Sequence, residues 1–367
     1  MLGVSDAMLG VAWPSMRAAF GAPLAGLGLV FAAITGGFLA ASTGVAALAP
    51  RLPTGARMIA AGIATCLAIA GFAVSPGWPA LVLAALVYGA AAGLLDPGLN
   101  AYVALHHSNR ELNLLHAGYG FGASLGPLVV SVALIAGLGW RMAYAPVLLL
   151  DLLLLIGFLA VRRAWRAPPQ ALARQRPPRA RTGLALGLAS FFAYTGIEVS
   201  AGGWSYSYLT LGREMTPGLA ALLVGSFWAA LTIGRVVAGA LSSRVSARAL
   251  LILSVIVALA GALTIAVRPV VGLPLLGLGL APIFPTLVSL TPGSQGDDGT
   301  PAAVGFQLAV GSLGAAVVPA LVGLALQRYG VGLLPALLIG AAGFQLALAL
   351  GARLRPLVSN VAHPRST

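Results

Sequence analysis

Half of the acidic residues of this chain lie inside long apolar stretches. The chain has 367 residues and only eight Asp and Glu in total. Four of these acids, Asp6, Asp96, Asp151 and Glu198, are surrounded by Leu, Ala, Val and Gly. A carboxylate in hydrocarbon costs about 3 kcal/mol on insertion scales, and such residues usually mark ion or substrate pathways. Because a carboxyl group can take up and release a proton, these acids are the first candidates for proton transfer.

Asp96 has the most promising local neighbourhood. Asn100 lies four residues further on, so the two side chains share a helix face with Tyr88. Pro97 removes a backbone donor and frees the carbonyl of Gly93, and broken helices often line transporter cavities. The alternative is an interhelical hydrogen bond with a packing kink. We expect Asp96 to handle protons, Asn100 to bind solute and Pro97 to have a structural or gating role.

Glu198 belongs to a polar and aromatic helix face. Tyr194, Ser205 and Tyr208 follow helical spacing from Glu198, and Trp204 is adjacent. Phenol and carboxyl groups bind hydroxyls, and an indole ring stacks on a sugar ring. We therefore expect Glu198 to take part in proton coupling, and Tyr194, Trp204 and Tyr208 to bind solute. The alternative for Glu198 is a structural ion pair.

The remaining candidates carry weaker signals. We expect Asp6 to handle protons for the same reason as Asp96. The alternative is an acid at a helix end near water. Asn113 and His116 share a helix face, and His116 can relay protons because histidine titrates near neutrality. We expect Asn113 and Gln307 to bind solute. Asp151 has no polar neighbours in the sequence, so we do not predict a site there.

The composition indicates a membrane protein. Hydrophobic residues make up 59% of the chain and charged residues 8%, against about 25% charged in soluble domains. The apolar runs lack the two-residue alternation of barrel strands, so we expect helices. A spanning helix needs about 20 apolar residues. The runs predict twelve helices, near 1–20, 25–49, 55–75, 79–105, 113–137, 142–164, 183–211, 217–243, 247–267, 269–291, 300–328 and 332–354.

Arginine placement predicts the orientation. The segment 162–182 carries seven Arg and four Pro and reads as a basic linker. With this linker in the cytoplasm, fifteen Arg fall on the cytoplasmic side and five on the outer side. We expect a multi-pass protein of a bacterial plasma (inner) membrane with both termini in the cytoplasm. The net charge of +13 is thus explained by topology, and no nucleic-acid partner is expected.

The two halves of the chain repeat each other. Ser124-Leu125-Gly126 recurs as Ser312-Leu313-Gly314 at an offset of 188. Ordered matches of this kind indicate two six-helix repeats, which are typical of secondary transporters. The predicted units are 1–161, the linker 162–182, 183–355 and a cytoplasmic tail 356–367. Further matches at offsets of 188 to 193 pair Gly89 with Gly277, Trp13 with Trp204 and Asp6 with Glu198. The halves differ at Asp96, which maps to Phe284.

Two halves joined by a basic loop resemble the major facilitator superfamily. The stretch Gly239-Ala-Leu-Ser-Ser-Arg-Val-Ser-Ala-Arg248 is similar to that superfamily's loop motif, with Ser243 in place of the usual acid. The copy in the first half is more degenerate and includes Arg51. The resemblance implies a cytoplasmic gate at Arg51, Arg244 and Arg248. For Arg235, a gating role is as open as a structural ion pair or a side chain that snorkels to the interface.

Within the superfamily the chain resembles the fucose–proton symporter group. The matching stretches are Asp6-Ala-Met-Leu-Gly-Val-Ala-Trp-Pro14, Leu95-Asp-Pro-Gly-Leu-Asn100, Leu112-Asn-Leu-Leu-His116, Gly196-Ile-Glu-Val-Ser200 and Ala281-Pro-Ile-Phe-Pro-Thr-Leu287. In that group, acids on helices 1 and 4 are implicated in proton and sugar handling. Asp6 and Asp96 stand at those places.

These observations favour an all-α membrane transporter of two pseudo-symmetric halves that imports a small polar solute, such as a sugar, with protons by alternating access. An efflux antiporter and a non-transporting membrane sensor or scaffold are the alternatives. We expect no enzyme activity, no cofactor and no metal, and we expect a monomer in the bilayer. Asp6 lies close to Met1, so either the first helix begins at depth or translation begins upstream of Met1; we favour the latter.

Overall fold

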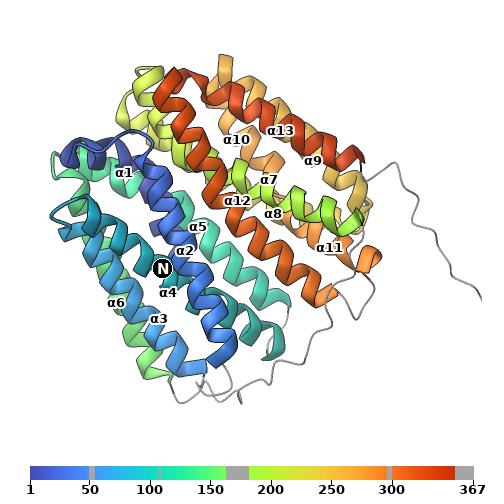
Figure 1. Cartoon of the computed structure of the whole chain (residues 1–367), viewed down its shortest axis with the longest axis horizontal. Coiled ribbons are helices and arrows are strands. Elements are labelled where there is room, and N and C mark those ends of the chain that lie inside the picture. The colour runs from blue at the N-terminus through green and yellow to red at the C-terminus, as the bar shows by residue number, and fades with distance from the viewer. Residues whose placement is uncertain (49–53, 107–108, 163–181, 296–299, 352–367) are drawn as a thin grey trace, which may run out of the picture.

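The computed structural model describes residues 1–48, 54–106, 109–162, 182–295 and 300–351, and within them every regular element is a helix (Figure 1). The helices of the first half are α1 (Leu2–Phe20), α2 (Gly26–Leu48), α3 (Thr54–Val74), α4 (Trp78–His106), α5 (Asn109–Ile135) and α6 (Gly139–Ala160). The second half contains α7 (Thr182–Ser207), the turn η1 (Tyr208–Gly212), α8 (Pro217–Leu241), α9 (Ala247–Val267), α10 (Pro269–Leu280), α11 (Ile283–Gln295), α12 (Thr300–Tyr329), the turn η2 (Val331–Leu333) and α13 (Leu334–Gly351).

The helices are membrane-spanning in length and composition. Among the described residues, eleven segments are long and apolar enough to cross a bilayer, and one of them, Pro269–Thr291, comprises α10 and most of α11. The 19-residue α1, which carries Asp6 and Arg17, completes the twelve. Large apolar side chains such as Leu149, Leu153 and Ile156 of α6 lie exposed on the surface, as lipid contact requires. The predicted all-α membrane fold is confirmed.

Several helix boundaries differ from those expected. The span predicted at 269–291 is interrupted at Ala281 and Pro282, because proline lacks an N–H and clashes with the preceding turn. The span predicted at 183–211 ends in the π-helical turn η1. The helix α5 begins at Asn109, four residues earlier than the predicted 113. Residues 163–181 of the basic linker and the tail 356–367 lie outside the described residues.

Glycine contacts support the predicted repeat. Gly89 of α4 packs directly against the backbone of Ile34 in α2, and Gly277 of α10 packs directly against the backbone of Phe227 in α8. Gly89 and Gly277 are the pair that the sequence repeat matches. Ile34 and Phe227 are 193 positions apart, which is within the offset that the sequence predicts for this part of each half. The same helix crossing is therefore used once in each half.

Within the described residues, the two halves meet mainly where α1 packs on α7, α2 on α12, and α5 on α8. Figure 1 shows α2 and α12 running side by side. The backbone N–H of Ala25 donates to Gln327 Oε1 at 2.9 Å, and Ser131 Oγ donates to the carbonyl of Pro217 at 3.4 Å. These contacts lie where α2 and α8 begin and where α5 and α12 end. The halves are thus joined at the end of the bundle that the arginine distribution predicts to face outward.

The first described residues of α1 lie inside the first half. The hydroxyl of Tyr88, from the middle of α4, lies 3.0 Å from the carbonyl of Leu2. The amino group of Met1 lies 3.9 Å from Asp151 Oδ1 in α6. Asp151 is fully buried, and among the described residues neither of its carboxylate oxygens has a hydrogen-bond partner. Figure 1 places this terminus among the helices of the first half.

Candidate functional site

Three helices of the first half converge on Asp6. The hydroxyl of Tyr88 in α4 donates to Asp6 Oδ1 at 2.8 Å, and the hydroxyl of Tyr119 in α5 donates to Oδ2 at 2.9 Å. Tyr88 is buried, whereas Asp6 and Tyr119 are partly buried. Each carboxylate oxygen therefore has one phenolic donor. We call Asp6, Tyr88 and Tyr119 the Asp6 cluster.

A second polar group lies in the other half and is formed by α7 and α8. The hydroxyl of Tyr194 donates to Glu198 Oε2 one helical turn further along α7. Arg235 of α8 places Nη2 at 3.4 Å from the Tyr194 hydroxyl and at 3.8 Å from Glu198 Oε2. We call Tyr194, Glu198 and Arg235 the Arg235 cluster. It contains both a cation and an anion within an apolar span.

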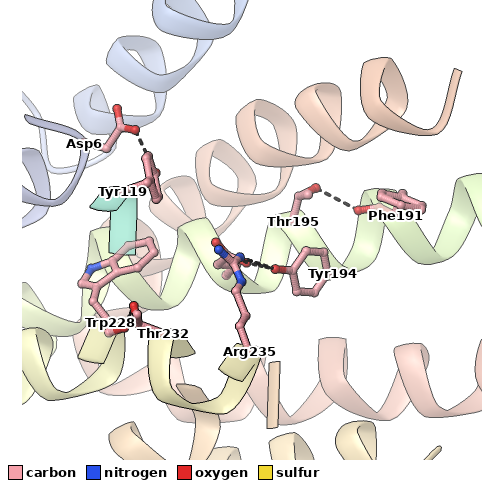
Figure 2. A network of polar contacts seen from close by, with 9 residues as sticks. Asp6, Tyr119, Phe191, Tyr194, Thr195, Trp228, Thr232 and Arg235 are labelled. Carbon is pink, nitrogen blue, oxygen red and sulfur yellow. Dashed lines mark hydrogen bonds and ion pairs between the residues drawn. The ribbon is translucent and has the colours of Figure 1, made fainter. Parts of the chain in front are cut away.

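The two clusters lie near each other across the boundary between the halves (Figure 2). Tyr119 is within electrostatic reach of both Glu198 and Arg235. The helices that carry them come together because Gly120 of α5 has no side chain and lets Thr232 of α8 approach its backbone. Thr232 Oγ1 in turn donates to a carbonyl of its own helix at 2.9 Å. The arrangement puts Tyr119 between the two partly buried acids.

Asp96 lies apart from both clusters. Its carboxylate Oδ1 and its carbonyl each accept from Asn100 Nδ2 at 2.8 Å, and the side chain of Asp96 is exposed. The helix α4 continues through Pro97, in line with the single helix predicted near 79–105. Asp96 still has an electrostatic interaction with Asp6. The pairing of Asp96 with Asn100 is as expected, whereas their part in transport stays a prediction.

Three residues expected to bind solute are instead buried in helix packing. The indole N–H of Trp204 donates to a backbone carbonyl of α12 at 2.9 Å, and the Tyr208 hydroxyl donates to one of α9 at 3.4 Å. Gln307 Oε1 accepts from Thr291 Oγ1 at 3.0 Å. All three are less than 5% exposed. Of the aromatic side chains predicted at the site, Tyr194 alone belongs to one of the two clusters.

The predicted gate residues lie at the end of α8 and the start of α9. Arg244 is exposed in the turn between these helices, and Arg248 lies partly buried in the first turn of α9. Ser246 caps α9 by accepting a hydrogen bond from the N–H of Ala249 at 3.3 Å. Arg51 and the side chains of Asn113 and His116 lie outside what the structure describes, so their roles stay predictions.

Tyr119 is the functional candidate that the sequence reading missed. It lies between Gly118 and Gly120, in a stretch that reads as a small-residue packing face. The signal that could have found it is its spacing of three residues from His116, which places both on one side of α5. Within the described residues no group of three or more His, Cys, Asp or Glu side chains converges as a metal site would require.

Twelve apolar helices in two repeated halves, with polar groups at the boundary between them, define a secondary-transporter architecture. The sequence profile of the Major Facilitator Superfamily matches residues 1–319. The chain therefore belongs to the major facilitator superfamily and is a multi-pass membrane transporter. No curated protein sequence matches it.

Solved structures agree with this assignment at the level of the fold. A single-residue variant of the Escherichia coli fucose:proton symporter FucP is 18% identical with a TM-score of 0.63, and the match covers 95% of each chain. The human organic anion transporter MFSD10 (TETRAN) is 20% identical with a TM-score of 0.63, over 88% of this chain and 83% of that one. FucP in its outward conformation is 18% identical with a TM-score of 0.61, and the match covers 95% of this chain and 96% of that one. The predicted resemblance is confirmed.

Proposed function

We propose that this transporter imports a small polar solute together with protons, and that Asp6 carries the coupled proton. The observation that supports this most is the Asp6 carboxyl group held by two tyrosines from two other helices, beside the boundary with the second half. A partly buried carboxyl with access to that boundary can exchange protons with the solute pathway. The bacterial inner membrane, cytoplasmic termini and a monomeric state are part of the same proposal.

Protonation of Asp6 would change how its helices are joined. The carboxylate accepts one hydrogen bond on each oxygen and so links α1 to both α4 and α5. A protonated carboxyl must use one oxygen as a donor, and hydrogen bonds to a charged carboxylate are the stronger ones. Taking up a proton therefore loosens the link between these three helices. This loosening is a physical route from proton binding to movement of the halves.

The polar character of the solute is supported by the groups available at the boundary. Phenol, carboxyl and guanidinium groups from Asp6, Tyr119, Glu198 and Arg235 are suited to hydroxyl and other polar substituents. A sugar is one candidate, in line with the fucose:proton symporter among the structural neighbours. The organic anion transporter among those neighbours shows that the fold also occurs with acidic cargo.

Proteoliposomes with the purified chain test the proposal. We expect solute uptake to require an inward proton gradient and to be accompanied by proton entry. Asp6→Asn should reduce gradient-driven uptake by about tenfold or more while solute exchange across the membrane without a proton gradient continues. Asp96→Asn is the matched comparison, and we expect it to affect uptake less. Intact coupled uptake in Asp6→Asn would overturn the role of Asp6, and opposed fluxes of solute and protons would establish antiport.

A further inference from the structure

Arg235 is a cation placed within a membrane span. It lies six residues before the end of α8, among the exposed apolar residues Ile233, Val236 and Val237. A charged residue at such a position usually faces a polar pathway and has a partner there. The side chain of Arg235 is turned toward α7, where Tyr194 and Glu198 lie (Figure 2).

The contacts of Arg235 with its neighbours leave most of its binding capacity unused. Glu198 Oε2 lies 3.8 Å from Arg235 Nη2, which is longer than a hydrogen bond. Arginine and carboxylate normally meet through two parallel N–H···O bonds, and Glu198 instead accepts from Tyr194. Within the described residues, one hydrogen bond, to the Tyr194 hydroxyl at 3.4 Å, engages the five N–H donors of the guanidinium.

The free donors of Arg235 are also accessible. Its side chain is 28% exposed, against 15% for Glu198. The guanidinium lies within electrostatic reach of Tyr119, at the boundary where the halves meet. A structural ion pair would be better satisfied by closer contact and fuller burial. A solute that enters this boundary therefore meets a planar guanidinium whose remaining N–H groups are available as donors.

We propose that Arg235 binds a carboxylate of the transported solute, so that the cargo is a small organic acid rather than a neutral sugar. This inference rests on the proposed transport function and narrows its substrate class. The guanidinium fork matches a carboxylate in shape and charge, and the apolar surroundings strengthen the attraction. Tyr119 and Tyr194 supply hydroxyls for the polar substituents of the same molecule.

Glu198 acts as a competitor in this arrangement. It is the acid nearest to Arg235, and its charge offsets part of the attraction for a second carboxylate. The other charged or titratable groups near the site are Tyr194 on α7, which is the helix of Glu198, Tyr119 on α5, and Asp6 on the far side of Tyr119. The helices α10, α11 and α13 contribute no charged side chains. Removing the charge of Glu198 should therefore strengthen the binding of an acid, whereas removing that of Arg235 should weaken it.

Matched pairs of neutral compounds and acids test the proposal on the purified full-length protein. The pairs are galactose and galacturonate, glucose and gluconate, and glycerol and glycerate, with thermal stabilisation and then affinity as the readout. We expect at least one acid to stabilise the protein and its neutral partner to have no effect. Stabilisation by neutral members alone, or by no acid at all, would overturn the proposal.

Two variants then separate solute binding from a structural ion pair. Arg235→Gln should lower the affinity for the stabilising acid at least tenfold, and Glu198→Gln should raise it. A purely structural pair predicts that both variants lose stability alike and keep the wild-type affinity. If Arg235→Gln does not fold, Arg235→Lys keeps the charge without the fork and should still lose affinity severalfold; wild-type affinity in that variant overturns the proposal.

The outcome is distinguishable from that of the proposed symport. Acid binding that needs Arg235, without any proton flux, would overturn the symport and leave this inference standing. Proton-driven uptake of a neutral sugar with no effect of Arg235→Gln would overturn this inference and leave the symport standing.

Discussion

At the scale of single residues, the two partly buried acids Asp6 and Glu198 are both held by tyrosine. Asp6 has two phenolic donors from different helices, whereas Glu198 has one from its own helix. The difference matters because only the contacts of Asp6 join separate helices. A change in the protonation state of Asp6 would therefore act on α4 through Tyr88 and on α5 through Tyr119.

Removing either phenol should weaken proton coupling. A hydrogen bond to a charged group contributes about 1.5–3 kcal/mol, so Tyr119→Phe or Tyr88→Phe should reduce gradient-driven uptake by about tenfold. Rates of uptake measured against an imposed pH gradient check this. Tyr144→Phe is the matched control, because the Tyr144 hydroxyl is buried and has no hydrogen-bond partner among the described residues. Equal losses in all three variants would show that the effect is one of packing and not of Asp6.

At the scale of helices, close approach through glycine determines how the elements pair. The crossing of α2 with α4 at Gly89 and that of α8 with α10 at Gly277 leave no room for a side chain. Helix association in membranes depends on such contacts, because lipid offers no hydrophobic driving force between helices. The helix α1 is attached to the rest of its half by polar contacts as well, through Tyr88 and Tyr119.

Adding one methyl group at either crossing should destabilise the fold. In Gly89→Ala and Gly277→Ala the new Cβ would meet a backbone carbonyl of the partner helix, and overpacking of this kind costs about 1–3 kcal/mol. The melting temperature of the purified protein should fall in both variants by similar amounts, since the positions are repeat-related. Gly157→Ala in α6, where no described atom lies within 4 Å of the added Cβ, should melt as the wild type does. Tolerance of alanine at both crossings would contradict the packing.

At the scale of the whole molecule, the halves are in contact at the end where α2 and α8 begin. Alternating access requires these contacts to open during transport, because a site between the halves must be exposed to each side in turn. The contacts involve small residues, such as Gly28 of α2 against Ala320 of α12. Small residues allow a close but separable fit.

A cross-link at this end should stop transport. The Cβ of a residue replacing Gly28 would lie 2.8 Å from Ala320 Cβ, so a pair of cysteines there can form a disulfide after a small adjustment. In a Cys66→Ala background, oxidation of Gly28→Cys/Ala320→Cys should reduce uptake to about a tenth or less, because the rocking of the halves is blocked. Reduction should restore it.

A second cysteine pair within one half serves as the control. Gly71 of α3 and Ala84 of α4 are similarly close, with 3.0 Å between an added Cβ and Ala84 Cβ. Oxidation of Gly71→Cys/Ala84→Cys should leave uptake intact, since α3 and α4 move together. Full transport by the protein cross-linked between Gly28 and Ala320 would show that this end does not open.

Much of the architecture could be predicted from the sequence. Span number and approximate ends follow from apolar length, and the repeat follows from matches such as Gly89 with Gly277. The pairing of Asp96 with Asn100 was also within reach, because residues four apart on a helix lie on one face. The break at Pro282 and the buried placement of Trp204 and Gln307 were missed, since both depend on packing against other helices.

The sequence by itself determined the class of this protein, because the apolar length of each span and the order of the repeats are properties of local stretches. It also identified the four acids within apolar spans, because their cost in hydrocarbon is independent of the fold. Only the tertiary structure decided which of them form a site. Asp6 meets Tyr88 and Tyr119 across 82 and 113 residues of chain, and Arg235 meets Tyr194 across 41. Helical spacing reports neighbours on one helix, such as Tyr194 for Glu198, whereas the tyrosines that hold Asp6 and the arginine beside Glu198 come from other helices.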